Sequence, residues 1–524
     1  MQSGLRLAGE VRGMDMLVEA EDEREARPSG AQRRVKFPRH ERGGFMWGLR
    51  LPQFIVVISA ILSIVGLIML QQLSLALMWS LIAVPVGVVG AITWKGRPLM
   101  SRLWSAAKWR ARMALGETRW RTTEAPVAAG ALMLPGDVGV RLSVHATKWG
   151  GGIFYDARSQ RVTAVLKCES QGWDLASDAD RSERTQGFAK LCAMVARTPA
   201  VERVVSMART IPSETTAARQ AHERTVKERE VEDEWGRDVM ASVLTGREFV
   251  DGKGQLRGPE DQQVAVSRDT LLAISVSVPK AQKQIRSYGG GLQGAAEVLS
   301  AEISRFRDRV TAAGVTHSEW LTPAQLGDVA RLALDVDATE ILARTVDERD
   351  QDRFDLGSAL LVDDADPEVL VTNGGVHSTF WISEWPRTEV PLGFLQDLIC
   401  EGQYPSVVTQ VFTTEDTGTA FRKTSRELDS MASVFDMNRR LGRRTSILDQ
   451  RAVPDLKERE NELADGHVQL RVVGYVRVSG RDRDELAVNE DKMHAAAPNL
   501  DLQRLKHLQW EGFVASSLPV GWGL

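Results

Sequence analysis

The chain has few of the residues that usually mark a metal-binding or disulfide-stabilised protein. Its three cysteines, Cys168, Cys192 and Cys400, are far apart, form no CxxC pair, and none has a histidine close by in the sequence. This spacing predicts neither a zinc site nor a disulfide framework. Three reduced structural thiols suit a reducing cytosol.

Sequence motifs for catalysis are also missing. The eight histidines are scattered, and neither HExxH nor GxSxG occurs. The string nearest to a Walker A loop, residues 246–255, is one residue too long and has Gly254 where the hydroxyl residue should be. The glycine-rich string at 288–297 lacks the lysine. We therefore predict that the chain is not an enzyme and assign no catalytic, cofactor-binding or metal-binding residue.

Short acidic strings are the only residues that suggest a metal site. They occur at Asp178–Asp180, Asp335–Asp337 and Asp363–Asp366. A DxD triplet can hold a metal–nucleotide sugar, so a membrane-anchored transferase is an alternative, although such triplets are common in surface turns. Trp381 and Trp385 are spaced by four on a predicted strand, which favours core packing or a contact with a partner protein.

The chain has no excess of one charge sign. Its formal net charge is −4 over 524 residues. Proteins that bind nucleic acid usually carry a basic domain or stripe. We therefore predict no direct nucleic-acid binding.

A long hydrophobic run is what the sequence does contain. Residues 51–94 include no charged side chain. Because one helix of ~20 residues crosses a bilayer core, we predict two membrane spans, at about 53–70 and 75–94, joined at Gln71 and Gln72. The alternative interpretation is a buried helical hairpin in a soluble protein. The run starts too far along the chain for a cleaved signal peptide.

Basic residues flank this run on both sides. The candidate membrane-flanking residues are Arg39, Arg42, Arg50, Lys95, Arg97 and Arg102. The positive-inside rule places both flanks in the cytoplasm. We therefore predict a protein of the inner (plasma) membrane that contacts the lipid bilayer and has both termini in the cytoplasm.

The predicted organisation is α+β, with an N-terminal transmembrane helical hairpin followed by cytoplasmic mixed α/β domains. The segments are a disordered tail (1–34), the hairpin (35–96), a basic juxtamembrane helix (97–125), a first α+β domain (126–260), a middle segment (261–370) and a C-terminal domain (371–524). The juxtamembrane helix could lie on the membrane surface or pack on the cytoplasmic domain, and the sequence leaves both open.

The C-terminal segment has the clearest pattern. Strands predicted at 377–386, 406–415 and 467–479 alternate with helices, and a short strand is predicted near 500–505. This order predicts a ferredoxin-like (split βαβ) layer. Such a layer is a scaffold and does not by itself indicate an activity.

Several segments resemble a known family. They are RVKFPRHERGG and WKGRPLMSRLW around the hydrophobic run, GGIFYDARSQRVTAVL, LCAMVARTPAVERVVSMARTIP, HSTFWISEWPRTEVPLGFL, and the ending SLPVGWGL. Over about residues 35–524 the chain resembles the two-helix membrane proteins of actinobacterial conjugation-type gene clusters. The hairpin is similar to the small VirB-type inner-membrane subunit, and the rest to the non-ATPase domain of the VirB-type traffic ATPase.

The resemblance implies a non-catalytic scaffold or docking subunit of a type IV secretion-like (conjugation) machine. Its implied partners are a separate VirB-type traffic ATPase and other inner-membrane secretion subunits, in an oligomeric assembly. No catalytic residue is carried over, because catalysis in that family belongs to a motor that this sequence does not include. The alternative within the same class is the E component of the type VII secretion core.

Overall fold

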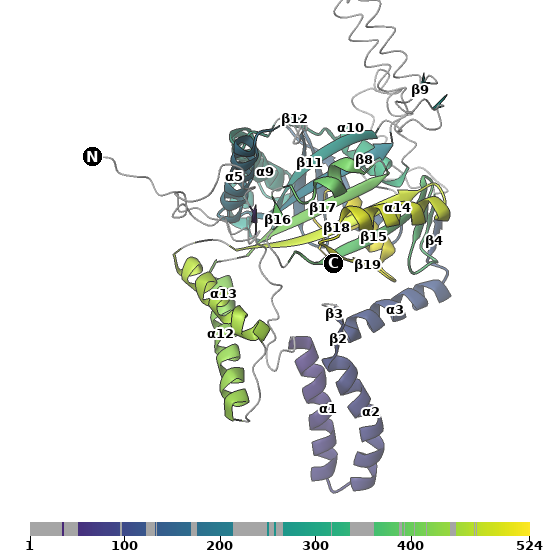
Figure 1. Ribbon diagram of the computed structural model, residues 1–524, viewed down its shortest axis with the longest axis vertical. Helices are drawn as coiled ribbons and strands as arrows, with labels where there is room; N and C mark the ends of the chain where they lie inside the picture. The colour runs from purple at the N-terminus through teal and green to yellow at the C-terminus, as the bar shows by residue number, and fades with distance from the viewer. Residues whose placement is uncertain are drawn as a thin grey trace, which may run out of the picture.

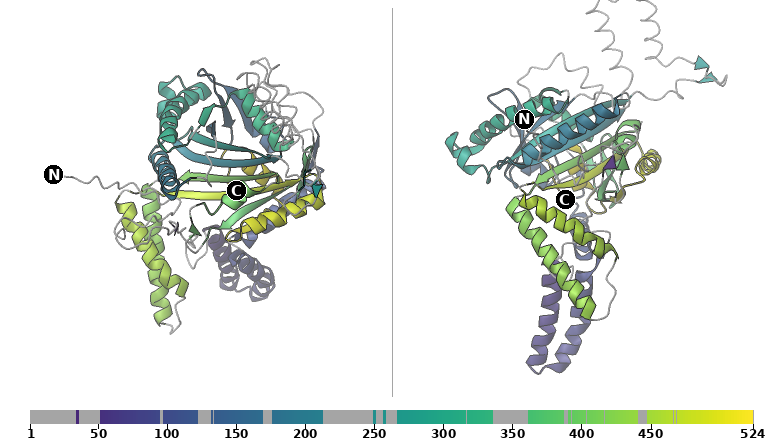
Figure 2. Two further views of the ribbon diagram at one scale, coloured as in Figure 1. Left: turned by 45° about the horizontal axis from the view of Figure 1, so that its top comes forward. Right: turned by 60° about the vertical axis from the view of Figure 1, so that its left-hand side comes forward.

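A large antiparallel sheet forms the centre of the computed structural model (Figure 1). The structure describes residues 34–35, 51–94, 97–121, 132, 134–168, 176–212, 249–250, 256–257, 266–315, 317–335, 361–386, 390–391, 393–402, 404–415, 417–440, 447–465, 467 and 469–523. Within these ranges the fold is mixed α/β. The described helices pack on both faces of the sheet or project from it (Figure 2).

The first half of the sheet comes from residues 137–334, which we name the first repeat. Its strands are β5 (Leu142–Ala146), β6 (Gly152–Asp156), β7 (Arg161–Cys168), β8 (Val201–Pro212), β11 (Val266–Ser277) and β12 (His317–Trp320). Its helices are α4 (Asp137–Arg141), α5 (Asp178–Ala196), α8 (Gln282–Ser287), α9 (Gly291–Ala312) and α10 (Pro323–Leu334). The β-hairpin predicted over 151–168 is confirmed by the pairing of β6 with β7.

The second half comes from residues 361–517, the second repeat. Its strands are β13 (Leu361–Asp363), β14 (Leu370–Thr372), β15 (Gly375–Glu384), β17 (Ser406–Thr414), β18 (Leu470–Gly480) and β19 (Asp501–Arg504). Its helices are η3 (Asp397–Glu401), α12 (Thr417–Arg440), α13 (Ile447–Ala464), α14 (Arg483–Ala496) and α15 (Gln509–Ser517). These elements follow the strand and helix pattern predicted for the C-terminal segment.

The two repeats pair their strands in the same way. In the first, the order is β12-β7-β11-β8, and in the second it is β19-β15-β18-β17, with every pair antiparallel. Counted along each chain segment, both are fourth-first-third-second. In each repeat the first strand also forms a hairpin with the strand before it, β6 or β14. Strands β8 and β17 then pair with each other and join the two halves into one sheet.

This pairing changes how the predicted segments relate to one another. Strand β11 begins after the predicted boundary at 260, yet it pairs along its length with β7 and β8. Strands β13 and β14 lie before the predicted boundary at 370 and extend the sheet of the second repeat. Each repeat therefore continues across a predicted boundary.

Alternation along the strands divides the core between the two faces. Val165 belongs to a cluster that runs across both repeats and is covered by α10 and α15, whereas Ala164 and Leu166 point to the other face. On that other face, α5 and α9 cover the first repeat, and η3 and α14 cover the second. Successive side chains of a strand point to opposite faces, so one run of apolar residues supplies both layers.

Local capping signals set the helix ends. Thr322 accepts from the backbone N–H of Gln325, whose side chain in turn accepts from the N–H of Thr322, and Pro323 opens α10. This capping box confirms the cap predicted at Thr322, and it satisfies two N–H groups that have no partner inside the helix.

The polar helix predicted at 213–244 lies outside the described residues. Of the loop predicted at 245–261, only β9 (Phe249–Val250) and β10 (Leu256–Arg257) are described, and they pair antiparallel.

The uncharged run folds as two adjacent helices. They are α1 (Leu51–Met69) and α2 (Leu73–Ala91), which turn at Leu70–Gln72, where Gln71 has φ +57°. Among the described residues, only α2 is long and apolar enough to cross a membrane. The apolar stretch of α1, Gln53–Met69, is shorter. A turn at the predicted glutamines is confirmed, and two membrane spans stay a prediction.

Small residues line the contact between α1 and α2. Ala76 and Ala83 are 3% and 4% exposed. A Cβ at Gly90 would lie 2.8 Å from Val56 Cγ1, so only glycine fits there without a shift. The Gln53 side chain donates to the Gly90 carbonyl at 3.0 Å. The helices therefore approach closely and satisfy their polar groups between themselves.

Short strands connect the helical hairpin with the sheet. Strands β2 (Thr93–Trp94) and β3 (Arg97–Pro98) pair after α2, and α3 (Leu99–Ala114) follows. Strand β4 (Arg119–Arg121) then pairs with β13 at the edge of the large sheet. Before the hairpin, β1 (Arg34–Val35) pairs with β16 (Val390–Pro391).

Candidate junction between the helical hairpin and the sheet

Helix α3 is held on the second repeat by a buried tryptophan. Trp109 is 8% exposed, and its Nε1 donates to the Asp364 carbonyl oxygen at 2.9 Å. Its ring meets that of His507 edge-on, with the centroids 5.3 Å apart. A tryptophan is expected to find a hydrogen-bond partner when it is buried. This contact shows that α3 packs on the domain, one of the two arrangements left open by the sequence.

Two arginines of α3 extend the same contact. Arg112 Nη1 lies 3.2 Å from the Asp364 carboxylate and 3.9 Å from that of Glu511 on α15. About two helical turns before Trp109, Arg102 Nη2 donates to Gln503 Oε1 on β19 at 3.1 Å. Arg102, which we predicted as a membrane-flanking charge, therefore contacts the body of the protein.

The chain after α3 becomes part of the sheet itself. Trp120 of β4 is opposite Val362 of β13 and packs against the core shared by both repeats. The Thr118 carbonyl accepts from the Asp364 N–H at 2.8 Å. Any movement of α3 would therefore be transmitted to the edge of the sheet through both side chains and backbone.

Asp364 places a buried carboxyl group in this junction. Its side chain is 2% exposed. Burial raises the pKa of the carboxyl to about 7, although the nearby Arg112 charge acts in the opposite direction. In the unfolded chain the pKa of an aspartate is about 3.9. The folded form therefore binds the proton more tightly than the unfolded form.

We expect this carboxyl to make the stability of the junction fall with rising pH. Its stabilising contribution is fully present below pH ~4 and is lost as the pH rises to about 7, a change on the order of 4 kcal/mol for a group this buried. Asp364→Asn removes the ionisation, so the difference in free energy of unfolding between wild type and variant should change across this window. Urea unfolding at pH 5 and pH 8 measures it. An Asp178→Asn variant, at an exposed site, is the control. Equal differences at both pH values would contradict the assignment.

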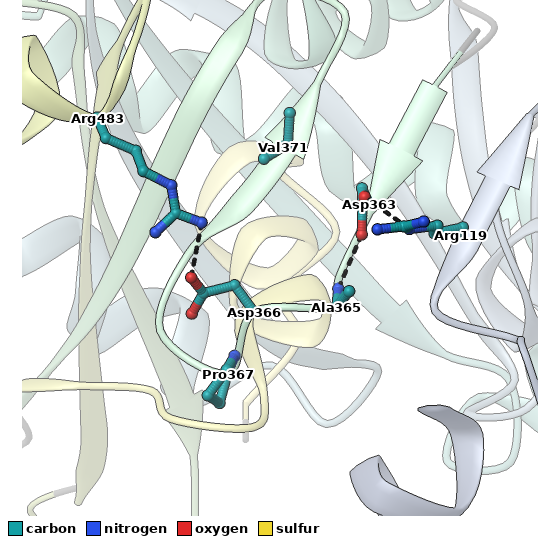
Figure 3. Close-up of a pocket in the computed structure, with 7 residues that line it drawn as sticks. All are labelled: Arg119, Asp363, Ala365, Asp366, Pro367, Val371 and Arg483. Atoms are coloured by element: carbon teal, nitrogen blue, oxygen red, sulfur yellow. Dashed lines mark hydrogen bonds and ion pairs between the residues drawn. The ribbon is translucent and has the colours of Figure 1, made fainter. Parts of the chain in front are cut away.

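The acidic string at 363–366 does not form a converging set of ligands. Asp363 accepts from Arg119 Nε at 3.0 Å, and Asp366 accepts from Arg483 Nη2 at 2.7 Å (Figure 3). Asp364 is buried beside Arg112. Each carboxylate thus faces its own arginine, and the surface pocket between the first two pairs is lined by both signs of charge. Among the described residues, no three His, Cys, Asp or Glu side chains gather as a metal site would require.

The other acidic strings lie elsewhere. Asp178 and Asp180 begin α5, and Asp180 forms a capping box with Ser177. Asp335 is the C-cap of α10, and Asp337 lies outside the described residues. The three strings are therefore not brought together where the structure describes them.

The remaining predicted residues have mixed outcomes. Trp381 and Trp385 are both partly buried, but they pack against different core clusters because the register shifts between Ile382 and Glu384. A bulge of this kind moves the following residue to the other face. Their role as candidate partner contacts stays a prediction. Of the basic flank, Arg97 belongs to β3, whereas Arg39, Arg42, Arg50 and Lys95 lie outside the described residues.

A buried histidine forms hydrogen bonds that sequence reasoning missed. His377 Nδ1 lies 2.7 Å from Ser479 Oγ, and Nε2 lies 2.7 Å from Thr372 Oγ1. The histidine is 0% exposed and its pKa is lowered well below the usual value by burial and by the Arg477 charge. The arrangement has the residue types of a nucleophile and a base, but all three side chains are buried. It ties together β14, β15 and β18.

A second buried cluster, the C-terminal clasp, joins the residues that follow the second repeat to the first repeat. It consists of Asp156, Arg141, Arg161, Arg203 and Trp522. Trp522 Nε1 donates to the Asp156 carboxylate at 3.0 Å, and the Arg141 guanidinium lies 4.0 Å from the centroid of the Trp522 ring. Arg161 and Arg203 both donate to the Gly521 carbonyl. Residues after the second repeat are thus fixed on the first.

Comparisons with known proteins give no family assignment. No protein-family model matches the chain, and no curated protein matches it significantly.

Proposed function

We propose that the protein is a non-catalytic membrane scaffold, in which α1 and α2 cross the inner membrane and α3 couples them to a cytoplasmic platform. The observation that carries this proposal is the apolar surface of the two helices. Their exposed side chains include Ile55, Leu62, Met69, Leu77, Leu81, Ile82 and Val88, each more than half exposed. A soluble protein rarely leaves an apolar surface of this extent in water.

The packing between α1 and α2 supports the same arrangement. Trp79 Nε1 donates to Ser63 Oγ at 2.9 Å, and Ser59, Ser63 and Ser80 donate to backbone carbonyls of their own helices. A lipid environment requires polar groups to be satisfied within the protein. Close contact through glycine and alanine is typical of helices that associate in a membrane. On this basis we treat both helices as spans, although α1 on its own is the shorter candidate.

Helices α12 and α13 set a limit on the position of the bilayer. They project from the same side of the sheet as α1 and α2 (Figures 1 and 2). Arg422, Arg426 and Arg439 of α12 are exposed, and an arginine at the centre of a bilayer is costly. The proposal therefore requires α12 and α13 to lie at the headgroup layer or to turn away from it at their links to β17 and β18.

We propose further that this scaffold belongs to a type IV secretion-like (conjugation) machine, where it holds a separate cytosolic ATPase at the membrane. The resemblance of the sequence segments supports this assignment. Two split βαβ layers joined edge to edge at β8 and β17, as we interpret the repeats, would offer a broad platform for a partner. The acidic string at 363–366 gives little support to a transferase, because arginines neutralise its carboxylates.

Purification from native membranes tests this function. We expect the tagged full chain to remain in the membrane pellet after alkaline carbonate extraction. We also expect it to bring down an ATPase and further inner-membrane proteins after mild solubilisation, as identified by mass spectrometry. An equally tagged, unrelated two-span protein is the control. Recovery of the chain in the soluble fraction would contradict the anchor, and a membrane-bound chain with no ATPase would contradict the secretion role.

A further inference from the structure

Helix α3 has a second face that the contacts with the body leave open. Leu103 and Trp104 are 49% and 73% exposed, and Leu115 at the end of the helix is 73% exposed. The docked residues Arg102 and Trp109 lie on the other side. At 100° per residue, the three apolar side chains fall within about one third of the helix circumference, roughly opposite the docked side.

Basic residues border this apolar face. Lys108 and Arg110 are exposed, and at helical spacing they fall on its two edges. Long basic side chains at such positions can lay their aliphatic stems along the apolar layer and keep their charges among anionic headgroups. A helix that met another protein would not require a cation on each edge of its apolar stripe.

The position of α3 agrees with this pattern. It follows α2 after the paired strands β2 and β3, and the Leu99 N–H donates to the Ile92 carbonyl at 2.9 Å. It runs across the direction of α1 and α2, between them and the sheet (Figure 1). If α2 spans a bilayer, the start of α3 is therefore held at the level where the headgroups begin.

We propose that the face of α3 formed by Leu103, Trp104 and Leu115 is buried in the cytoplasmic surface of an anionic bilayer, so that α3 is held between lipid on one side and the second repeat on the other. This inference rests on the proposed anchor and adds an interaction surface to it. The helix then fixes the orientation of the sheet relative to the membrane, which a flexible linker could not do.

Site-specific fluorescence in proteoliposomes tests the proposal. The full chain with Cys400→Ser leaves Cys168 and Cys192, which are 4% and 2% exposed and whose pKa values burial raises to about 12, so neither reacts readily. An environment-sensitive dye is attached in turn to Trp104→Cys, to Ile82→Cys on α2 and to Val488→Cys on α14, and 82 and 488 are 57% and 53% exposed in the native chain. The vesicles contain phosphatidylcholine and phosphatidylglycerol, with and without lipids brominated near the headgroup.

We expect brominated lipid to quench the dye at position 104 by about twofold and to leave the dye at 488 unchanged. Adding Lys108→Glu and Arg110→Glu should weaken that quenching in anionic vesicles. If the dye at 82 is shielded in the bilayer but the dye at 104 is not quenched, this inference is wrong and the proposed membrane anchor is still supported. A dye at 104 that is shielded from water but not quenched by lipid would also overturn it, because another protein surface would then cover α3. If the dyes at 82 and at 104 are both exposed to water, the proposed membrane anchor is wrong as well.

Discussion

Replacing Asp156 with alanine is expected to cost about 3–5 kcal/mol of the free energy of unfolding, because it removes the buried carboxylate that pairs with Arg141 and Arg161. The Asp156 side chain is 4% exposed and accepts from Arg141 at 2.6 and 2.7 Å. The Arg161 side chain, 6% exposed, lies 3.8 Å away. The variant would also deprive Trp522 Nε1 of its partner and so loosen the residues that follow the second repeat from the first repeat.

The pH dependence gives this prediction a signature. Burial alone would raise the pKa of Asp156, but hydrogen bonds from Arg141 and Ser159 hold it at about 2. A carboxyl with a lowered pKa contributes stability that is present above the unfolded value of about 3.9 and is lost as the pH falls towards the folded value. The difference between wild type and Asp156→Ala should therefore be largest at neutral pH and shrink between pH ~4 and pH ~2.

Urea unfolding of the detergent-solubilised full chain, followed by tryptophan fluorescence, measures the effect. Asp178→Ala is the matched control, since that side chain is 69% exposed at the start of α5 and should change stability by no more than about 0.5 kcal/mol. Asp156→Asn keeps an acceptor oxygen and should fall between the two. A loss below about 1 kcal/mol for Asp156→Ala would mean that the clasp does not fix the residues after the second repeat on the first.

Much of the secondary structure could be predicted because the signals are local. The cap at Thr322, the alternation along β18 and the glutamines between α1 and α2 are each readable within a few residues. The same holds for the βαβ order of the last segment. Its strand order, with β18 between β15 and β17, follows from the usual way such units pack.

The duplication of the fold could not be predicted in this way. Pairing of β8 with β17 joins strands about two hundred residues apart, and nothing in either strand alone specifies the other. Long segments between the second and third strands of each repeat, residues 213–265 and 415–469, further separate the strands that pair. The predicted boundaries at 260 and 370 therefore fall within the ranges of the two repeats.

The contacts of α3 with the second repeat could not be predicted from the sequence either. Trp109 and Asp364 are 255 residues apart, and the carboxylates at 363–366 suggested a metal only because their arginine partners are remote in sequence. The positive-inside rule counts charges near a span and predicts no contact between Arg102 and Gln503 on β19. The position of Arg102 at the membrane stays a prediction.

An arginine placed at the middle of each helix of the hairpin is expected to release the protein from the membrane. Leu62 and Ile82 are 62% and 57% exposed and lie near the midpoints of α1 and α2. An arginine at the centre of a span costs about 3 kcal/mol of insertion free energy, so Leu62→Arg together with Ile82→Arg would lose about 6 kcal/mol. Because both side chains point away from the partner helix, the contact between α1 and α2 itself should be little affected.

Membrane fractionation after carbonate extraction measures this loss, and Val488→Arg provides the matched control. Val488 is 53% exposed on α14, so its replacement adds the same charge at a similar exposure but far from the hairpin. The control should remain in the pellet, whereas the double variant should move to the soluble or degraded fraction. Each single variant should be intermediate, since the costs at two separate helices add. If the double variant fractionates like Val488→Arg, the apolar surface of α1 and α2 does not face lipid, and the hairpin would instead be covered by protein.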